Sequence, residues 1–274
     1  MKRFLILTIT LIASVLFTLP SFAFTPGKWS HKDQFVFFKG KKGPSKEIVR
    51  NSEGQVIYVA EYIYDADGHL VQETYSDKEG KSDGKTIFRY TEGLVTSEEV
   101  YGQNDTLVER KDFVYKGKIL KRLIIKNFEG KNLISYSLET NKDGMLVSGE
   151  GKNSESKDIE SFRIIPDPKK LNVQIQFLLD DKKIKHGEIH FKYDAKGNLV
   201  EREFFQAEFH RVNKLKYKAD GSLESFSFHV KQGDNWVLEK THFLVYDENS
   251  KSKVSKQDKK EEFLTNGNNP PLEH

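Results

Sequence analysis

The heptapeptide Tyr64-Asp65-Ala66-Asp67-Gly68-His69-Leu70 decides the fold, because it carries the chemistry of a tight β-hairpin turn between two strand-like segments. The two residues before Gly68 suit the central positions of a type I turn. Gly68 then takes the positive φ that closes a bulged hairpin, a conformation that a residue with a Cβ resists. This geometry predicts that Tyr64 lies directly opposite Leu70, as an aromatic–aliphatic pair that stabilises the hairpin by about 0.2–1 kcal/mol.

The same unit recurs along the chain, which indicates a repeat protein. Tyr193 to Leu199 and Tyr217 to Leu223 repeat the pattern, so Tyr193 is expected opposite Leu199 and Tyr217 opposite Leu223. A second series of turns, at Gly54, Gly80, Asn104-Asp105 and Gly130, lies between the units of the first series, and turns therefore arrive every 12 or 13 residues. This spacing is typical of an antiparallel meander of hairpins. The turn glycines of the first series are Gly68, Gly93, Gly117, Gly144, Gly197 and Gly221.

The sequence therefore predicts an all-β fold, an antiparallel meander of repeated β-hairpins that forms an extended twisted or curled sheet or an open half-barrel. The repeat domain is expected over residues 24–247, where no stretch sustains the 3.6-residue period of a helix. Segment 149–161 is polar and is expected to be a long loop or a degenerate hairpin end, with a soft division of the domain near 149–168. Residues 248–274 are rich in Lys, Ser, Asn and Glu, and are expected to form a disordered tail.

Residues 1–23 have the pattern of a secretory signal peptide. Lys2 and Arg3 precede an apolar run, and Ser21-Phe22-Ala23 presents small residues at the two positions that a signal peptidase reads. The alternative, an uncleaved membrane anchor, is disfavoured because the run is short for a bilayer span. We therefore expect an exported protein, periplasmic or extracellular. The chain has no cysteine, so its stability must come from burial and backbone pairing without disulfides.

Charge excludes two further classes of protein. Loss of residues 1–23 lowers the formal net charge from +3 to +1, which gives the domain no electrostatic preference for nucleic acid. Strands such as 107–113 carry charges on both faces, which argues against an outer-membrane barrel with a lipid-facing surface. No later stretch is long and apolar enough for a transmembrane helix.

The units at 64–70 and 193–199 resemble the tyrosine–aspartate repeats of the Rhs and teneurin type. They also resemble the looser MORN-variant repeats of exported bacterial proteins. The resemblance extends over residues 50–247, and three heptapeptides match well. It implies extended hairpin strips that wrap or bind a partner, with no shared catalysis.

One segment has the residue types of a metal site. In His186-Gly187-Glu188-Ile189-His190, the side chains of His186, Glu188 and His190 share one face of a strand, and two imidazoles with a carboxylate are ligands that zinc accepts. However, residues i and i+4 of a strand lie about 13 Å apart, too far for both imidazoles to reach one ion without a bend. An exposed polar face is the alternative, and we expect neither a metal nor another cofactor.

No motif of nucleophilic catalysis is present, so we expect a non-catalytic protein. The leading hypothesis is a binding or interaction protein of the cell envelope, whose open sheet edges and repeat surface meet a protein or polymer partner. The alternative is a periplasmic carrier that holds a lipid or another apolar ligand in a half-barrel. That alternative requires one continuously apolar face around a cavity.

Overall fold

The computed structural model describes residues 30–37, 43–142, 145–166 and 173–246. The predictions for the signal peptide, the C-terminal tail and Gly144 concern residues outside these ranges. The elements, in chain order, are α1 (Asp33–Val36), β1 (Lys46–Asn51), β2 (Val56–Tyr64), β3 (Leu70–Asp77), β4 (Ser82–Thr91), β5 (Leu94–Tyr101), η1 (Gln103–Asp105), β6 (Leu107–Lys116), β7 (Ile119–Asn127), β8 (Asn132–Thr140), β9 (Leu146–Asn153), β10 (Asp158–Pro166), β11 (Val173–Asp180), β12 (Lys185–Tyr193), β13 (Leu199–Gln206), β14 (Phe209–Tyr217), β15 (Leu223–Gln232) and β16 (Asn235–Val245).

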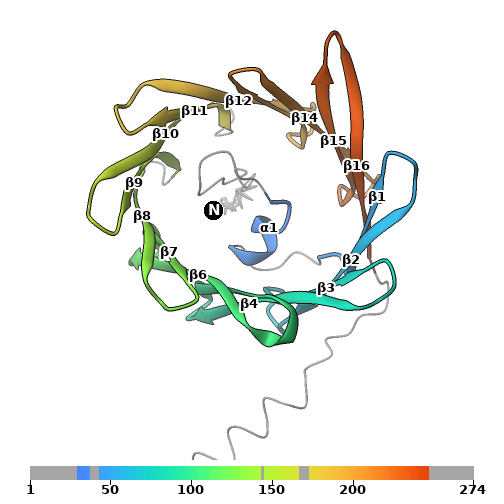
Figure 1. Cartoon of the computed structure of the whole chain (residues 1–274), viewed down its shortest axis with the longest axis horizontal. Helices are drawn as coiled ribbons and strands as arrows, with labels where there is room; N and C mark the ends of the chain where they lie inside the picture. Colours follow the sequence, from blue (N-terminus) through green and yellow to red (C-terminus); the bar gives the residue numbers. More distant parts are fainter. Residues whose placement is uncertain (1–29, 38–42, 143–144, 167–172, 247–274) are drawn as a thin grey trace, which may run out of the picture.

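The strands form one antiparallel meander, as predicted, and the meander closes into a barrel of 16 strands (Figure 1). Each strand pairs with the next along the chain, and β1 pairs with β16 from Lys46–Val245 to Asn51–Lys240. The predicted open sheet or half-barrel is therefore wrong. The strand twist that curls a sheet brings its two ends together once enough strands are present, and closure pairs the backbone groups that would otherwise remain at two free edges.

The hairpin turns have the geometry that their sequence requires. Gly68, Gly197 and Gly221 have φ of +89°, +86° and +83°. In the first unit the carboxylate of Asp65 accepts the backbone N–H groups of Asp67 and His69, at 2.9 and 2.8 Å. Tyr64 pairs with Leu70, Tyr193 with Leu199 and Tyr217 with Leu223, each beside a register shift that marks a bulge.

The repeat tyrosines also link neighbouring units through their hydroxyl groups. Tyr90 donates to the carbonyl oxygen of Leu70 at 2.8 Å, and Tyr217 donates to that of Leu199 at the same distance. A bond from Tyr246 to the carbonyl of Leu223, at 3.0 Å, repeats the arrangement at the last unit. The phenol therefore satisfies a buried backbone carbonyl of the unit before it, which explains why these positions hold tyrosine and not phenylalanine.

Of the two alternatives expected for 149–161, the long loop is wrong and a hairpin end is present, because β9 and β10 pair with each other and their turn lies within the segment. Its glycines are covered by aromatic rings from the neighbouring strands. A Cβ on Gly149 would lie 2.3 Å from the ring of Phe162, and one on Gly151 would lie 2.8 Å from that of Tyr136. The rings thus replace the missing side chains and allow strands to form in a segment that looks polar and weak. Pairing continues from β9 through β10 to β11.

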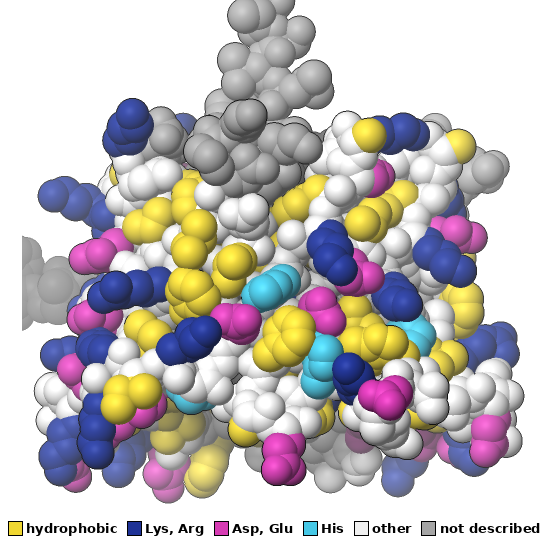
Figure 2. Space-filling view, turned by 90° about the horizontal axis from the view of Figure 1, so that it is seen from above, with side chains coloured by type: hydrophobic (Ala, Val, Ile, Leu, Met, Phe, Trp, Pro, Cys, Tyr) yellow, Lys and Arg dark blue, Asp and Glu magenta, His cyan; other side chains and the backbone are white. Residues whose placement is uncertain are grey.

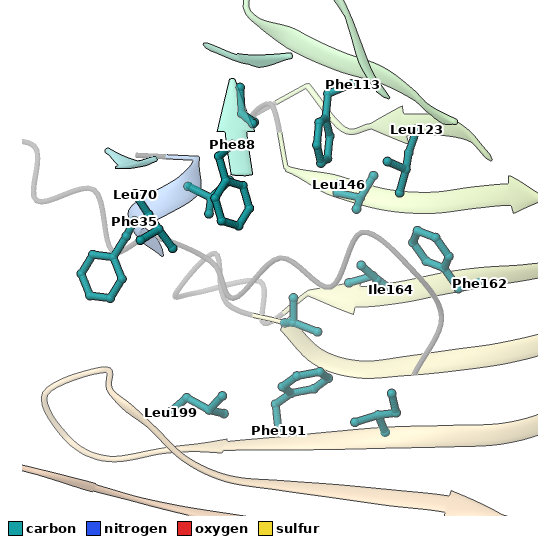
Figure 3. Packing of buried hydrophobic residues seen from close by; sticks show 14 of the residues in the cluster. Phe35, Leu70, Phe88, Phe113, Leu123, Leu146, Phe162, Ile164, Phe191 and Leu199 are labelled. Atoms are coloured by element: carbon teal, nitrogen blue, oxygen red, sulfur yellow. The ribbon is translucent and has the colours of Figure 1, made fainter. Parts of the chain in front are cut away.

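The hydrophobic core lies on the inward faces of the wall. Figure 3 shows side chains such as Phe113, Phe162 and Phe191 directed inward from strands around the barrel. α1 lies inside the barrel (Figure 1), where Phe35 packs edge-on against Tyr64 with ring centroids 5.9 Å apart. A sixteen-stranded wall is too wide for its own side chains to fill, so a segment inside it supplies part of the core on the β2–β6 side.

The outer face of the wall carries charges of both signs between hydrophobic side chains, as Figure 2 shows for the side that is uppermost in Figure 1. On β4 to β7 these charges form a network: the Glu99 carboxylate contacts Arg89 at 3.1 Å and Arg110 at 3.2 Å, and Asp112 contacts Arg110 and Lys126, both at 2.6 Å. Among the described residues, no helix has the length and apolar character needed to cross a membrane.

Candidate functional site in the barrel lumen

Two groups of polar side chains on the lumen-facing side of the wall differ in their hydrogen bonding. One group, the Glu47 cluster, consists of Glu47, Tyr62 and His242 from β1, β2 and β16, together with His31 just before α1. The other, the Arg202 cluster, consists of Gln176, Arg202, Arg211 and Asn213 from β11, β13 and β14. The Glu47 carboxylate is satisfied within the first cluster, where Nε2 of His242 alone lacks a partner among the described residues, whereas several donors of the second cluster lack one.

The carboxylate of Glu47 is the centre of the first cluster. It accepts hydrogen bonds from the Tyr62 hydroxyl and from His242, and the Nε2 atom of His31 lies 3.2 Å away. Burial alone would raise the pKa of Glu47, but the hydrogen bond from His242 and the charges of both imidazoles outweigh burial and lower that pKa to about 2. The cluster thus holds a buried carboxylate in its charged form and fixes the β1–β16 junction.

The segment around α1 is tied to the wall by the same kind of contact. Burial lowers the pKa of His31 to about 4 in spite of the nearby Glu47, so the neutral ring donates its Nε2–H to the carboxylate. Lys32 forms an ion pair with Glu73, which is buried on β3. Burial and the Glu98 charge raise the pKa of Asp33 to about 8, against the opposing effect of Lys32. These contacts anchor the segment inside the barrel and satisfy the Glu47 carboxylate within the first cluster.

The contribution of His31 to stability should fall as the pH drops from 7 to 4, while the raised pKa of Asp33 acts in the opposite direction over this range. The folded-state pKa of His31 lies below its ordinary value of 6.5, so the unfolded chain binds more protons at this position, and the contribution is lost as pH falls from 6.5 towards 4. The lowered pKa of Glu47 acts in the same direction below 4.5. We expect the His31 shift to cost about 2–3 kcal/mol of unfolding free energy by pH 4. Urea unfolding followed by circular dichroism at several pH values measures it as the difference in unfolding free energy between wild type and His31→Asn, which should shrink by this amount between pH 6.5 and 4. A difference that stays constant over this range would contradict the assignment.

The Arg202 cluster places two guanidinium groups close together on the inner wall. Arg202 is 5% exposed and donates to the Asn213 side chain at 3.3 Å. Burial lowers the pKa of Arg202 to about 10, and the neighbouring charge of Arg211 adds to the effect. Two adjacent cations in a region of low dielectric repel each other, and an anion between them would relieve both the repulsion and the loss of hydration.

Several donors of this cluster have no hydrogen-bond partner among the described residues. They are Nε of Arg211, Nδ2 of Asn213 and the amide of Gln176, whose side chain is fully buried. A buried donor without an acceptor costs about 1–3 kcal/mol, so a natural sequence rarely keeps three of them together without a partner. Arg211 and Asn213, two residues apart on one face of β14, are therefore arranged to donate hydrogen bonds to a group that has several acceptor oxygens.

An apolar strip separates the two parts of the cluster. Cross-strand pairing sets Gln176 beside Ile189, Ile189 beside Phe204, and Phe204 beside Arg211. Since adjacent strands are about 4.8 Å apart, this row spans about 14 Å from Gln176 to Arg211. A molecule that lies along it would meet cations at one end, an isoleucine and an aromatic ring in the middle, and an amide at the other end.

The predicted metal candidates lie elsewhere. The outer face of β12, which points away from the lumen, carries the side chains of His186, Glu188 and His190. The Nε2 atom of His190 lies 3.0 Å from Glu188, and His186 instead contacts the side chain of Gln206 at 3.0 Å. No group of three or more His, Cys, Asp or Glu side chains able to hold a metal occurs within the described ranges. The straight strand keeps the imidazoles apart, as its 3.3 Å rise per residue requires.

The fold defines a class, a closed antiparallel β-barrel built from hairpin repeats with polar clusters on its inner wall. No protein-family model and no curated protein matches the chain.

Solved structures with a similar course of the chain include two porin-like proteins of Bacteroides. One, from Bacteroides uniformis, is 11% identical with a TM-score of 0.48, and the match covers 76% of this chain and 98% of that one. The other, from Bacteroides vulgatus, is 10% identical with a TM-score of 0.43, with 75% and 99% covered. A protein of unknown function from Bacteroides fragilis is 10% identical with a TM-score of 0.15, with 57% and 88% covered.

Proposed function

We propose that this protein is a non-catalytic binding protein of the cell envelope, which takes up a small organic anion with an apolar body in its barrel lumen. The observation that carries the proposal is the Arg202 cluster, with two neighbouring cations and three donors that lack partners in the described part of the chain. A carboxylate or phosphate supplies acceptors for the donors of Arg211 and Asn213, which lie at one end of the row. The adjoining strip of Ile189 and Phe204 accommodates the apolar body.

The closed wall changes the balance between the two functional hypotheses. Interaction through open sheet edges loses its basis, because β1 and β16 pair with each other. The carrier hypothesis gains support from a wide barrel whose inner wall has both aromatic and cationic side chains. The ion-pair network on the outside of β4–β7 favours an outer wall in water, and the signal-like residues 1–23 support export to the periplasm or the cell exterior.

Isothermal titration calorimetry with decanoate tests the proposal, with decan-1-ol as the uncharged comparison. We expect decanoate to bind more tightly than decan-1-ol, and Arg211→Gln to weaken decanoate binding by about 10-fold or more, because a charge-assisted hydrogen bond contributes about 1.5–3 kcal/mol. The alcohol should bind equally to both proteins. Lys214→Gln is the matched control, since Lys214 is exposed on the outer face of the same strand. Equal affinity for acid and alcohol, or an unchanged affinity in Arg211→Gln, would reject the luminal anion site.

A further inference from the structure

A second hollow lies on the outer face of the wall, over β8 to β11, and has a volume of about 530 Å³. We refer to it as the Ser161 pocket. Pairing places Ser161 between Glu150 of β9 and Leu179 of β11, and places Arg163 between Ser148 and Phe177 of the same strands. The two serines are short, while their neighbours are long, so a depression forms between the long side chains. The lumen and the Ser161 pocket are on opposite faces of the sheet, because Phe162, between Ser161 and Arg163, points inward.

The floor of the pocket contains an unsatisfied polar group. Ser161 is 3% exposed, and its Oγ atom has no hydrogen-bond partner in the part of the chain that the structure describes. Its strand position directs the hydroxyl outward, into the pocket that it lines. A buried hydroxyl without a partner is unfavourable by about 1–3 kcal/mol, so this group is best explained by a molecule that bonds to it.

The charges around the pocket leave one cation available. Lys183 pairs with Glu150 at 3.0 Å, and Glu139 accepts a hydrogen bond from Ser148 at 2.9 Å. Arg163 is exposed and forms no ion pair with the described carboxylates. Because Arg163 and Ser161 are two residues apart on one face of β10, their polar groups can reach the same ligand oxygens.

The remaining walls are apolar. Phe177 and Leu179 of β11 form one side, and Val147 and Ile165 border the others. A volume of 530 Å³ lies within the range of about 300–1,000 Å³ that is usual for small-molecule sites. The pocket therefore combines an apolar lining with a small number of convergent polar groups.

We propose that the Ser161 pocket binds a small aromatic carboxylate. The carboxylate accepts hydrogen bonds from the Arg163 guanidinium and the Ser161 hydroxyl, and the ring of the ligand packs against Phe177 and Leu179. The site is separate from the lumen, and it does not depend on the function proposed above. Three features of the pocket select the ligand: the Arg163 cation, the buried Ser161 hydroxyl and the apolar wall. A cationic ligand is excluded by the charge of Arg163, and a long neutral chain would leave both polar groups without a partner.

Titration calorimetry with biphenyl-4-carboxylate tests the site, with biphenyl-4-carboxamide as the uncharged comparison. Both are added to wild type and to Arg211→Gln, so that binding in the lumen, which Arg211→Gln weakens, is distinguished from binding in the pocket. We expect one saturable carboxylate site, about 10-fold or more weaker in Arg163→Gln and several-fold weaker in Ser161→Ala. Lys192→Gln, an exposed position on the outer face of β12, should leave the affinity unchanged.

Two results would contradict the proposal that the Ser161 pocket binds a carboxylate. One is the absence of saturable binding to the wild-type protein, and the other is equal binding by wild type, Arg163→Gln and Ser161→Ala. Decanoate affinity should be the same in Arg163→Gln as in wild type, so failure of this site and failure of the luminal site are distinguishable. Ser161→Ala should also unfold at the same or a higher urea concentration than wild type, because it removes an unsatisfied hydroxyl, and this shows that any loss of binding is not a loss of folding.

Discussion

Replacement of Glu47 by Gln should lower the free energy of unfolding by about 3–5 kcal/mol, the range found when one partner of a buried charged group is removed. The carboxylate accepts hydrogen bonds from Tyr62 and His242 and lies beside His31, and all of these side chains are at least nine-tenths buried. An amide of the same size turns one acceptor into a donor. It would therefore face donors and leave part of the cluster unsatisfied. Urea unfolding at pH 7, followed by far-ultraviolet circular dichroism, measures the change.

The matched control is Glu61→Gln on the outer face of β2. Glu61 contacts Lys46 at 3.0 Å, and both side chains are well exposed, so this ion pair should contribute less than about 1 kcal/mol. Each variant replaces one carboxylate with an amide, on the neighbouring strands β1 and β2. Glu47 faces the lumen, whereas Glu61 faces outward. Similar losses for the two variants would mean that the Glu47 cluster does not hold the junction of β1 and β16.

Phe162→Ala should destabilise the protein by about 3–5 kcal/mol, because a large ring is removed from a packed site. The ring is 1% exposed and covers Gly149 of the neighbouring strand. Its loss leaves both a cavity and an uncovered glycine in β9. Phe243→Ala, on the outer face of β16 where the ring is 40% exposed, should cost much less in the same urea measurement.

A double substitution separates this pairing from simple loss of burial. Gly149→Ala alone should be destabilising, since its Cβ would lie 2.3 Å from the Phe162 ring. Combined with Phe162→Ala, the same substitution has room for its Cβ and restores a side chain to the strand. We expect the double variant to be more stable than the sum of the two single losses predicts. Strict additivity would show that the ring does not replace the missing side chain of Gly149.

The local structure of the hairpins could be predicted from the sequence, and closure of the barrel could not. The turn at Gly68 follows from six neighbouring residues, because a tight turn is decided by short-range φ/ψ preferences. Closure of the barrel depends on strand number, strand tilt and register stagger together, and the sequence of a single repeat determines none of these. The pairing of Lys46 with Val245 joins positions that are almost the whole described chain apart.

The two luminal clusters also differ in how much of each could be predicted from the sequence. Glu47 and His242 meet only because the barrel closes, so no local pattern could have joined them. Arg202 and Asn213 belong to adjacent strands of one hairpin, and pairing across the hairpin 199–217 could have placed them opposite each other on one face, although the bulge beside Leu199 had to be known to identify that face as the inner one. The strands of segment 149–161 could not be predicted, because its glycines are weak strand formers alone, and the rings that cover them come from Phe162 and from Tyr136 on β8.

The adjacency of β1 and β16 sets the order in which the molecule can be completed. A chain that is made and threaded from its N-terminus has fifteen strands available before the last one emerges, and until then β1 presents an unpaired row of backbone groups to solvent. Pairing of β16 with β1 thus completes the barrel, and a chaperone that shields exposed strands would be needed most before β16 emerges. The proximity of β1 and β16 also makes the molecule suitable for circular permutation. A short linker could join the end of β16 to the start of β1, and new termini could then be placed at any exposed hairpin turn.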